Sequence, residues 1–185
     1  MIYSFFQICG RIILGENMDT KFWIAQFIGL IAFCILGCSY YKKEKKDILL
    51  LQMMAYIAFI VHYQLLGGIT GSVCNLLALV SFIIIYLFDK FKKNKKILVG
   101  ILVPILVVIS FLTYESVYSI FPIIGCVVAV FSFITDKEDI IRRYGIVAVV
   151  CWLIYAIVYN SYVSIIFEFV TLIVVTIAYF KRRKK

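Results

Sequence analysis

Charged side chains are scarce in this sequence of 185 residues, where Asp, Glu, Lys and Arg together make up 16% of the chain. An average soluble domain carries about a quarter charged residues and about half apolar ones. Here 64% of the residues are hydrophobic and the mean hydropathy is +1.05. So few polar residues cannot cover a water-exposed surface. The composition therefore excludes an ordinary soluble domain and predicts an all-α membrane protein.

Histidine occurs once, as His62, and none of the six cysteines forms a CxxC pair. All cysteines except Cys9 fall in long apolar segments, where we interpret them as small packing residues rather than disulfides or metal ligands. No set of ligand residues has the spacing that a metal requires, and no nucleophile motif or pair of acids is present. The sequence therefore predicts no metal, no cofactor and no enzymatic activity.

Apolar segments of about 20 residues, long enough to cross a bilayer as helices, recur along the chain. The windows predict seven transmembrane helices, at residues 22–41, 48–66, 69–88, 97–114, 117–134, 140–159 and 161–180. Only Gly67 and Gly68 separate the second and third segments, which predicts a tight antiparallel hairpin. Residues 1–20 are too short and too interrupted for a span and are expected to form an interfacial segment, unless translation begins at Met18.

Basic residues are distributed unevenly among the connections. Apart from Arg11 and Lys21, they lie in alternate connections, just beyond the fifth one at Arg142 and Arg143, or in the C-terminal run KRRKK. The positive-inside rule then predicts a multi-pass membrane protein with its N-terminus outside and its C-terminus in the cytoplasm. Because the net charge of +9 is confined to these clusters, it is expected to contact anionic lipid rather than nucleic acid.

The chain also repeats itself with an offset of 93 residues. The matched pairs are Ser39 with Ser132, Phe59 with Trp152, His62 with Tyr155, Asn75 with Glu168, and Tyr86 with Tyr179. An odd helix between two such halves makes them parallel, related by an axis along the membrane normal. The predicted parts are 1–20 (interfacial), 21–91 (first three-helix repeat), 92–115 (connector helix), 116–180 (second three-helix repeat) and 181–185 (basic cytoplasmic tail).

The run LLQ…HYQLLGGITGSVCNLLAL, residues 50–79, resembles the YgjV family of small bacterial inner-membrane proteins. The 3+1+3 layout is more distantly similar to the SWEET sugar facilitators, the PQ-loop proteins and the PnuC vitamin transporters. That similarity implies a transporter of a sugar- or vitamin-like solute. It also implies that the pairs Phe59 with Asn75 and Trp152 with Glu168 flank the substrate, although Glu168 stands where those carriers have an amide.

Five side chains are the candidate substrate-binding residues, because polar groups in membrane helices tend to face protein or a water-filled path. They are Phe59, Asn75, Trp152, Tyr155 and Glu168. Glu168 would bind a substrate or carry a proton, and Asn75 offers both donors and an acceptor. Each also has a structural alternative as a hydrogen bonder between helices, and the aromatic rings could instead belong to an interfacial belt.

Three further residues are candidates for gating or proton transfer. Histidine side chains ordinarily titrate near neutral pH, so His62 could relay or sense protons, or it could serve as a structural hydrogen bonder. Gln52 could close an inner gate or simply pack, and Pro122 could act as a hinge.

The leading hypothesis is a transporter or facilitator of a small polar solute that works by alternating access. The alternative is a non-transporting membrane scaffold or receptor that docks a partner on its basic cytoplasmic face. The sequence predicts the lipid bilayer and a small-molecule substrate as partners, and it leaves open whether the protein forms a homo-oligomer.

Overall fold

A computed structural model describes residues 20–39, 45–90, 96–134 and 138–183 of the chain. The predicted segment 1–20 therefore lies, apart from Thr20, outside the described residues. The described part is all helical, with seven α-helices, one short 3-10 helix and no strand. The helices are α2 (Thr20–Ser39), α3 (Lys45–Leu65), α4 (Ile69–Lys90), α5 (Lys96–Leu112), η1 (Val117–Ser119), α6 (Ile120–Ile134), α7 (Glu138–Val158) and α8 (Tyr162–Arg183).

The seven predicted helices are confirmed, and each end lies within three residues of its prediction. One difference is at residue 117, where the chain first makes the turn η1 and only then the helix α6. Another is at the C-terminus, where α8 continues to Arg183 and so includes the first residues of the basic run. The predicted and observed helix ends agree because the ends of long apolar helices depend on the local sequence pattern.

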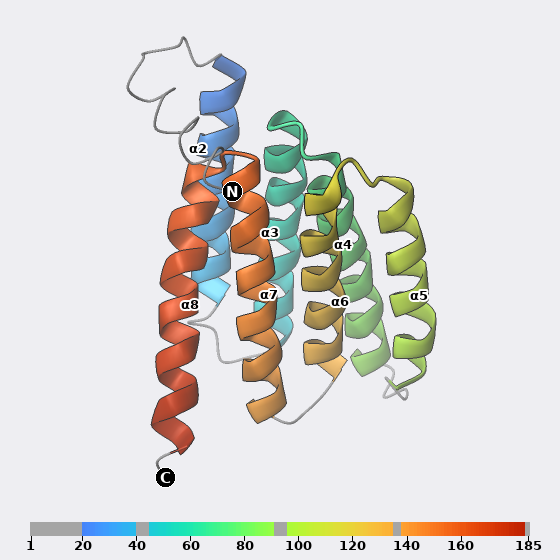
Figure 1. Cartoon of the computed structure of the whole chain (residues 1–185). Coiled ribbons are helices and arrows are strands. Elements are labelled where there is room, and N and C mark those ends of the chain that lie inside the picture. The colour runs from blue at the N-terminus through green and yellow to red at the C-terminus, as the bar shows by residue number, and fades with distance from the viewer. Residues whose placement is uncertain (1–19, 40–44, 91–95, 135–137, 184–185) are drawn as a thin grey trace.

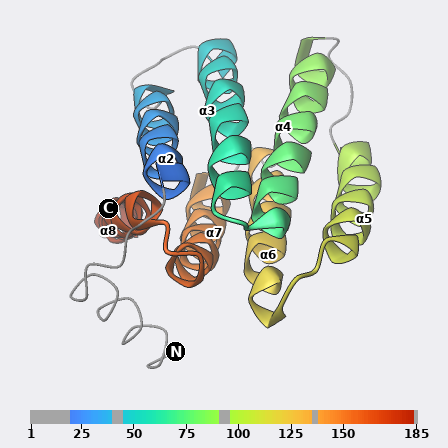
Figure 2. The ribbon, with the colours of Figure 1, turned by 90° about the horizontal axis from the view of Figure 1, so that it is seen from above.

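The helices form two layers. Figure 2 shows α2, α3 and α4 side by side in one row and α8, α7 and α6 in a second row, with α5 at one end. Contacts between α2 and α8 and between α4 and α6 join the rows, and α5 packs against α4 and α6. Successive helices alternate in direction, so the ends that border the basic connections all lie at the lower end in Figure 1. We call this the basic end and the opposite one the outer end.

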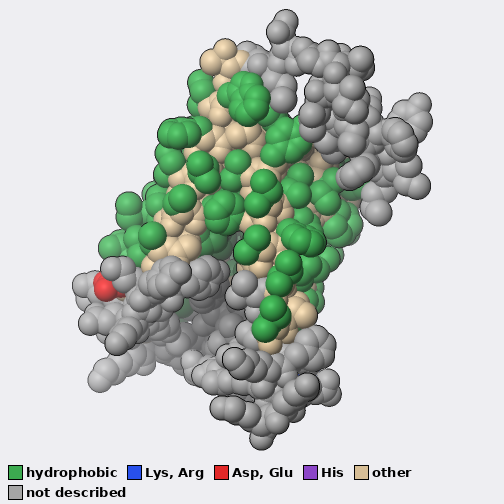
Figure 3. All heavy atoms as spheres, turned by 90° about the vertical axis from the view of Figure 1, so that its left-hand side faces the viewer, with side chains coloured by type: hydrophobic (Ala, Val, Ile, Leu, Met, Phe, Trp, Pro, Cys, Tyr) green, Lys and Arg blue, Asp and Glu red, His purple; other side chains and the backbone are tan. Residues whose placement is uncertain are grey.

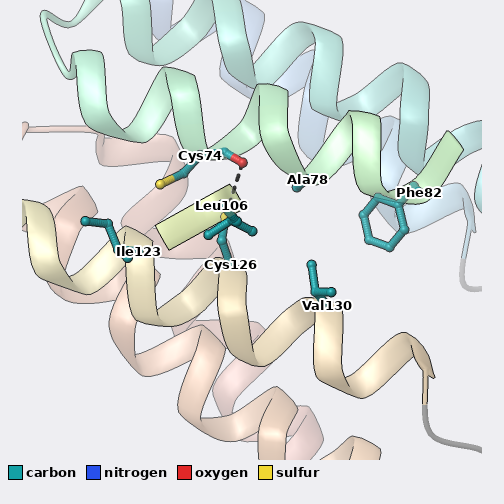
Figure 4. Packing of buried hydrophobic residues seen from close by; sticks show 7 residues of the cluster. All are labelled: Cys74, Ala78, Phe82, Leu106, Ile123, Cys126 and Val130. Carbon is teal, nitrogen blue, oxygen red and sulfur yellow. Dashed lines mark hydrogen bonds between the residues drawn. The ribbon is translucent and has the colours of Figure 1, made fainter. Parts of the chain in front are cut away.

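The largest apolar cluster lies where α4, α5 and α6 meet, and Figure 4 shows it from close by. It is formed by Cys74, Ala78, Phe82, Leu106, Ile123, Cys126 and Val130. The Cys126 thiol donates to the Cys74 carbonyl oxygen at 3.2 Å, so these sulfurs pack as small polarisable groups without forming a disulfide. Cys151 is buried as well.

Two cysteines depart from the prediction of packing residues. Cys34 and Cys38 are exposed on α2, on a side of the helix that no described helix covers. Their spacing of four residues puts them on one helix face, but only tertiary packing decides whether that face is covered. Cys9 lies outside the described residues.

The turns at residues 66–68 and 159–161 have the same structure. Gly67 has φ of 81° and Asn160 has φ of 53°, so both lie in the left-handed region that ends helices in a Schellman motif. The Gly68 amide donates to the Tyr63 carbonyl at 2.9 Å, and the Ser161 amide donates to the Ala156 carbonyl at 2.9 Å. The two turns are 93 residues apart, which is the offset of the predicted repeat, and their hydrogen bonds correspond.

Candidate functional site

A pocket of about 90 Å³ lies between the two layers of helices. Its walls come from α2, α3, α4, α7 and α8, so both halves of the sequence contribute. The lining residues are Phe33, Leu36, Tyr56, Phe59, Tyr63, Asn75, Trp152 and Glu168. Five of them are aromatic, one is an amide and one is a carboxylate.

Four of the five candidate substrate-binding residues line this pocket together: Phe59, Asn75, Trp152 and Glu168. Asn75 and Glu168 are each the seventh residue of their helices, α4 and α8, and they approach the pocket from opposite layers. The structure therefore brings these residues together.

The polar groups of the pocket differ in how they are bonded. The Asn75 amide nitrogen donates to the Gly71 carbonyl oxygen at 2.8 Å, which leaves the side-chain oxygen for other donors. Glu168 is half-buried, and no hydrogen bond or ion pair joins its carboxylate to any described residue. Unpaired carboxylates are rare inside membrane helices, so Glu168 is the outstanding group of this site.

Tyr155, the fifth candidate, does not line the pocket. Its side chain is fully buried closer to the outer end, where its hydroxyl oxygen accepts a hydrogen bond from the Gly71 amide at 2.9 Å. A Cβ atom at Gly68 would lie 2.7 Å from that hydroxyl oxygen. Two glycines at the start of α4 therefore make the space in which the Tyr155 ring sits.

His62 has a place in α3 that corresponds to the place of Tyr155 in α7. Its Nδ1 lies 2.6 Å from the carbonyl oxygen of Ala25 in α2, and its Nε2 lies 2.7 Å from the hydroxyl oxygen of Ser161. Because a carbonyl can only accept, Nδ1 carries a proton. The ring is fully buried, and a Cβ at Gly29 would lie 2.8 Å from it. His62 therefore does not contact the pocket.

His62 and Tyr155 thus make equivalent contacts across the layers. His62 reaches from α3 to the start of α8, at Ser161 and Ser164, while Tyr155 reaches from α7 to the start of α4, at Gly68 and Gly71. Subtracting 93 from 155, 161 and 164 relates one set of positions to the other. We call this pair of contacts the outer clasp.

The other two gating candidates lie away from the pocket lining. Gln52 is buried one helical turn nearer the basic end than Tyr56, and its Oε1 has no hydrogen-bond partner among the described residues. Pro122 is fully buried near the start of α6.

Sequence reasoning missed four lining residues: Phe33, Leu36, Tyr56 and Tyr63. A signal for two of them was present, because Tyr56, Phe59 and Tyr63 recur at helical spacing and form one aromatic stripe on α3. No such pattern marks Phe33 and Leu36, which enter the pocket only because α2 packs against α3.

A second polar cluster at the outer end was also missed. The Glu115 carboxylate accepts a hydrogen bond from the Thr70 amide at 3.1 Å and another from the Tyr159 hydroxyl at 3.0 Å. It thereby ties the connection after α5 to the start of α4 and the end of α7. Carboxylates stabilise helix N-termini, so a structural role accounts for this cluster. No group of three or more potential metal ligands occurs in the described part of the chain.

The outward surface of the bundle is strongly apolar. Figure 3 shows one face on which the described side chains are mostly hydrophobic. Large side chains stay exposed all around, among them Phe27 (63%), Val108 (60%) and Ile166 (63%). Among the described helices, residues Thr20–Ser39 and Ile69–Phe88 are long and apolar enough to cross a membrane by themselves, and the other apolar stretches are shorter. This surface and these helices fit a helical membrane protein.

Comparison with protein families identifies the family of membrane proteins to which the chain belongs. The model of the Imp-YgjV family, described as a bacterial inner membrane protein, matches residues 23–185. The chain therefore belongs to this family, which confirms the resemblance carried by the HYQLLGGITG block and supports location in the bacterial inner membrane. No curated protein and no solved structure matches the chain.

Proposed function

We propose that this protein is a transporter or facilitator of a small polar solute that works by alternating access. The single observation that carries the proposal is the pocket in which Asn75 and Glu168, equivalent positions of the sequence repeat, meet from opposite layers. Carriers built from repeats hold their substrate at the interface between the repeats. We further propose that α2–α4 and α6–α8 are two parallel three-helix repeats and that α5 connects them.

The corresponding turns at Gly67 and Asn160 support the duplication, because the agreement extends to backbone conformation and hydrogen bonds. Apolar similarity alone could arise by chance, but a matched left-handed residue at the same place is a local and specific feature. The equivalent contacts of His62 and Tyr155 support the same conclusion, since a two-fold axis between the layers would relate them.

The proposed topology has seven spans, with the basic end in the cytoplasm. A helix of 21 residues is about 32 Å long, which suits the hydrocarbon core of a bilayer. In α3 and α8 the apolar windows are shorter than the helices, because the sequence has basic residues at the end proposed to lie in the cytoplasm, as at Lys45 in α3 and Arg183 in α8.

Rocking of the two repeats would open the pocket to each side in turn. In the structure, the outer clasp and the hydrogen bond from Gln26 Nε2 to the Asn160 carbonyl oxygen hold the repeats together at the outer end. Opening to the outside would break these contacts. We therefore assign His62 to the outer gate, and Gln52 and Pro122 remain proposals for an inner gate and a hinge.

Solute uptake into proteoliposomes tests the proposal. We expect Glu168→Gln and Asn75→Ala each to lower uptake at least tenfold, because each removes a polar group from the pocket wall. Glu115→Gln is the matched control, since it makes the same chemical change at a glutamate outside the pocket. Unchanged uptake in both pocket variants, with a substrate that the parent protein carries, would contradict the site.

A further inference from the structure

We propose that the pocket binds a small organic cation, with Glu168 as its counterion and the aromatic side chains as its walls. This inference rests on the proposed function, because it names the class of solute that the proposed transporter would carry. It is drawn from three properties of the pocket: its charge, its aromatic lining and its size.

The charge of the pocket is unbalanced. Among the described residues that line the pocket, Glu168 is the only ionisable acid or base apart from two tyrosines, and none of them is a Lys, Arg or His. No described residue supplies a counter-charge to its carboxylate. Because an unpaired charge is costly inside a membrane protein, a bound cation would stabilise the ionised form of this group. An anionic solute would instead be repelled.

The aromatic lining also favours a positively charged solute. Phe33, Tyr56, Phe59, Tyr63 and Trp152 surround the pocket, and the rings of Tyr63 and Trp152 are 5.6 Å apart between centroids. The faces of aromatic rings attract cations, and clusters of such rings recognise ammonium and guanidinium groups. The free side-chain oxygen of Asn75 adds an acceptor for an N–H group.

The size of the pocket limits the cation. An apolar protein cavity of about 150 Å³ holds benzene, with about six heavy atoms. The pocket is partly open, so its volume of about 90 Å³ limits the enclosed part of the solute to about four heavy atoms. Guanidinium has that size, can donate two hydrogen bonds to one carboxylate and stacks on aromatic rings.

Tryptophan fluorescence of the full chain in lipid nanodiscs provides the test. Trp152 lines the pocket and Trp23 is 57% exposed at the start of α2, so Trp23→Phe leaves one tryptophan that reports on the pocket. The probes are guanidinium, urea and acetate, which share a flat shape and similar size but carry positive, zero and negative charge. Sodium chloride at equal ionic strength corrects for salt effects.

We expect guanidinium to change the Trp152 fluorescence saturably and urea and acetate to do so at least tenfold more weakly. Glu168→Gln should weaken guanidinium binding at least tenfold, whereas Glu115→Gln should leave it unchanged. Equal binding of urea and guanidinium to the parent protein would overturn the inference, and this comparison needs no variant to fold. Equal binding of guanidinium to Glu168→Gln and the parent would overturn it as well.

Uptake of radiolabelled guanidinium into proteoliposomes separates this inference from the carrier proposal. Selective binding without uptake would retain the cation site and contradict the carrier. Uptake of a neutral solute that Glu168→Gln does not affect would retain the carrier and contradict the cation site.

Discussion

Gly71 illustrates how single residues determine the contact between the layers. Its amide donates to the Tyr155 hydroxyl oxygen, and a Cβ added at this position would overlap the Tyr155 ring. Gly37 in α2 has no atom within 4 Å of the corresponding Cβ position. The two glycines therefore differ in whether a methyl group can be tolerated, and they allow a controlled comparison.

We expect Gly71→Ala to destabilise the protein by roughly 1–3 kcal/mol, the usual range for overpacking a tight contact. Tyr155 cannot retreat easily because Tyr63 and Tyr159 pack against its ring. The melting temperature in detergent is the measurement, with Gly37→Ala as the control that should change little. Equal melting temperatures for both variants would argue against a rigid contact at Gly71.

At the same scale, the sequence selected residues that lie near one another but did not distinguish those that line the pocket from those that do not. Phe59, Asn75, Trp152 and Glu168 were selected from the sequence and line one pocket, whereas Tyr155 was selected with them and lies in the outer clasp. Trp152 and Tyr155 are three residues apart on one helix face, so spacing could not separate them. The difference arises from the facing helix, where glycines accommodate Tyr155.

At the scale of elements, the two matched turns respond differently to the same backbone requirement. The positive φ of Gly67 causes no backbone strain, because glycine has no Cβ atom. Asn160 adopts a positive φ as well, and a residue with a Cβ does so with some strain. No atom lies within 4 Å of a Cβ at Gly67, so a substitution there would change backbone strain alone.

We therefore expect opposite effects from exchanging residue types at these turns. Gly67→Ala should destabilise the protein by about 1 kcal/mol, and Asn160→Gly should leave stability unchanged or raise it by up to about 0.5 kcal/mol. Thermal unfolding followed by circular dichroism measures both. A loss of stability in Asn160→Gly would mean that the asparagine side chain makes a contribution beyond its backbone conformation.

The helices themselves were predictable because apolar segments bounded by charged or glycine-containing connections carry a local signal. The exposure of Cys34 and Cys38 was not predictable in this way. It depends on which face of α2 meets α3 and α8, and that is a property of packing.

At the scale of the whole molecule, the alternating helix directions and the basic connections make a definite prediction for membrane topology. Green fluorescent protein fused after Lys185 should fluoresce, and alkaline phosphatase at the same place should be inactive, because the C-terminus is expected in the cytoplasm. Alkaline phosphatase fused after Ser116, at the outer end, should be active. An active phosphatase after Lys185 would contradict either the number of spans or their orientation.

The sequence by itself determined that the described part of the chain forms seven helices and that the chain belongs to a family of bacterial inner membrane proteins, and it predicts a repeat with an offset of 93 residues. The helices follow from local pattern and the family from sequence similarity, and neither needs knowledge of distant contacts. Only the tertiary structure decided that Asn75 and Glu168 share a pocket while His62 and Tyr155 join the layers outside it. The physical reason is that side chains on neighbouring turns of one helix meet different partners, and packing across the two layers selects which of them retain space for a ligand.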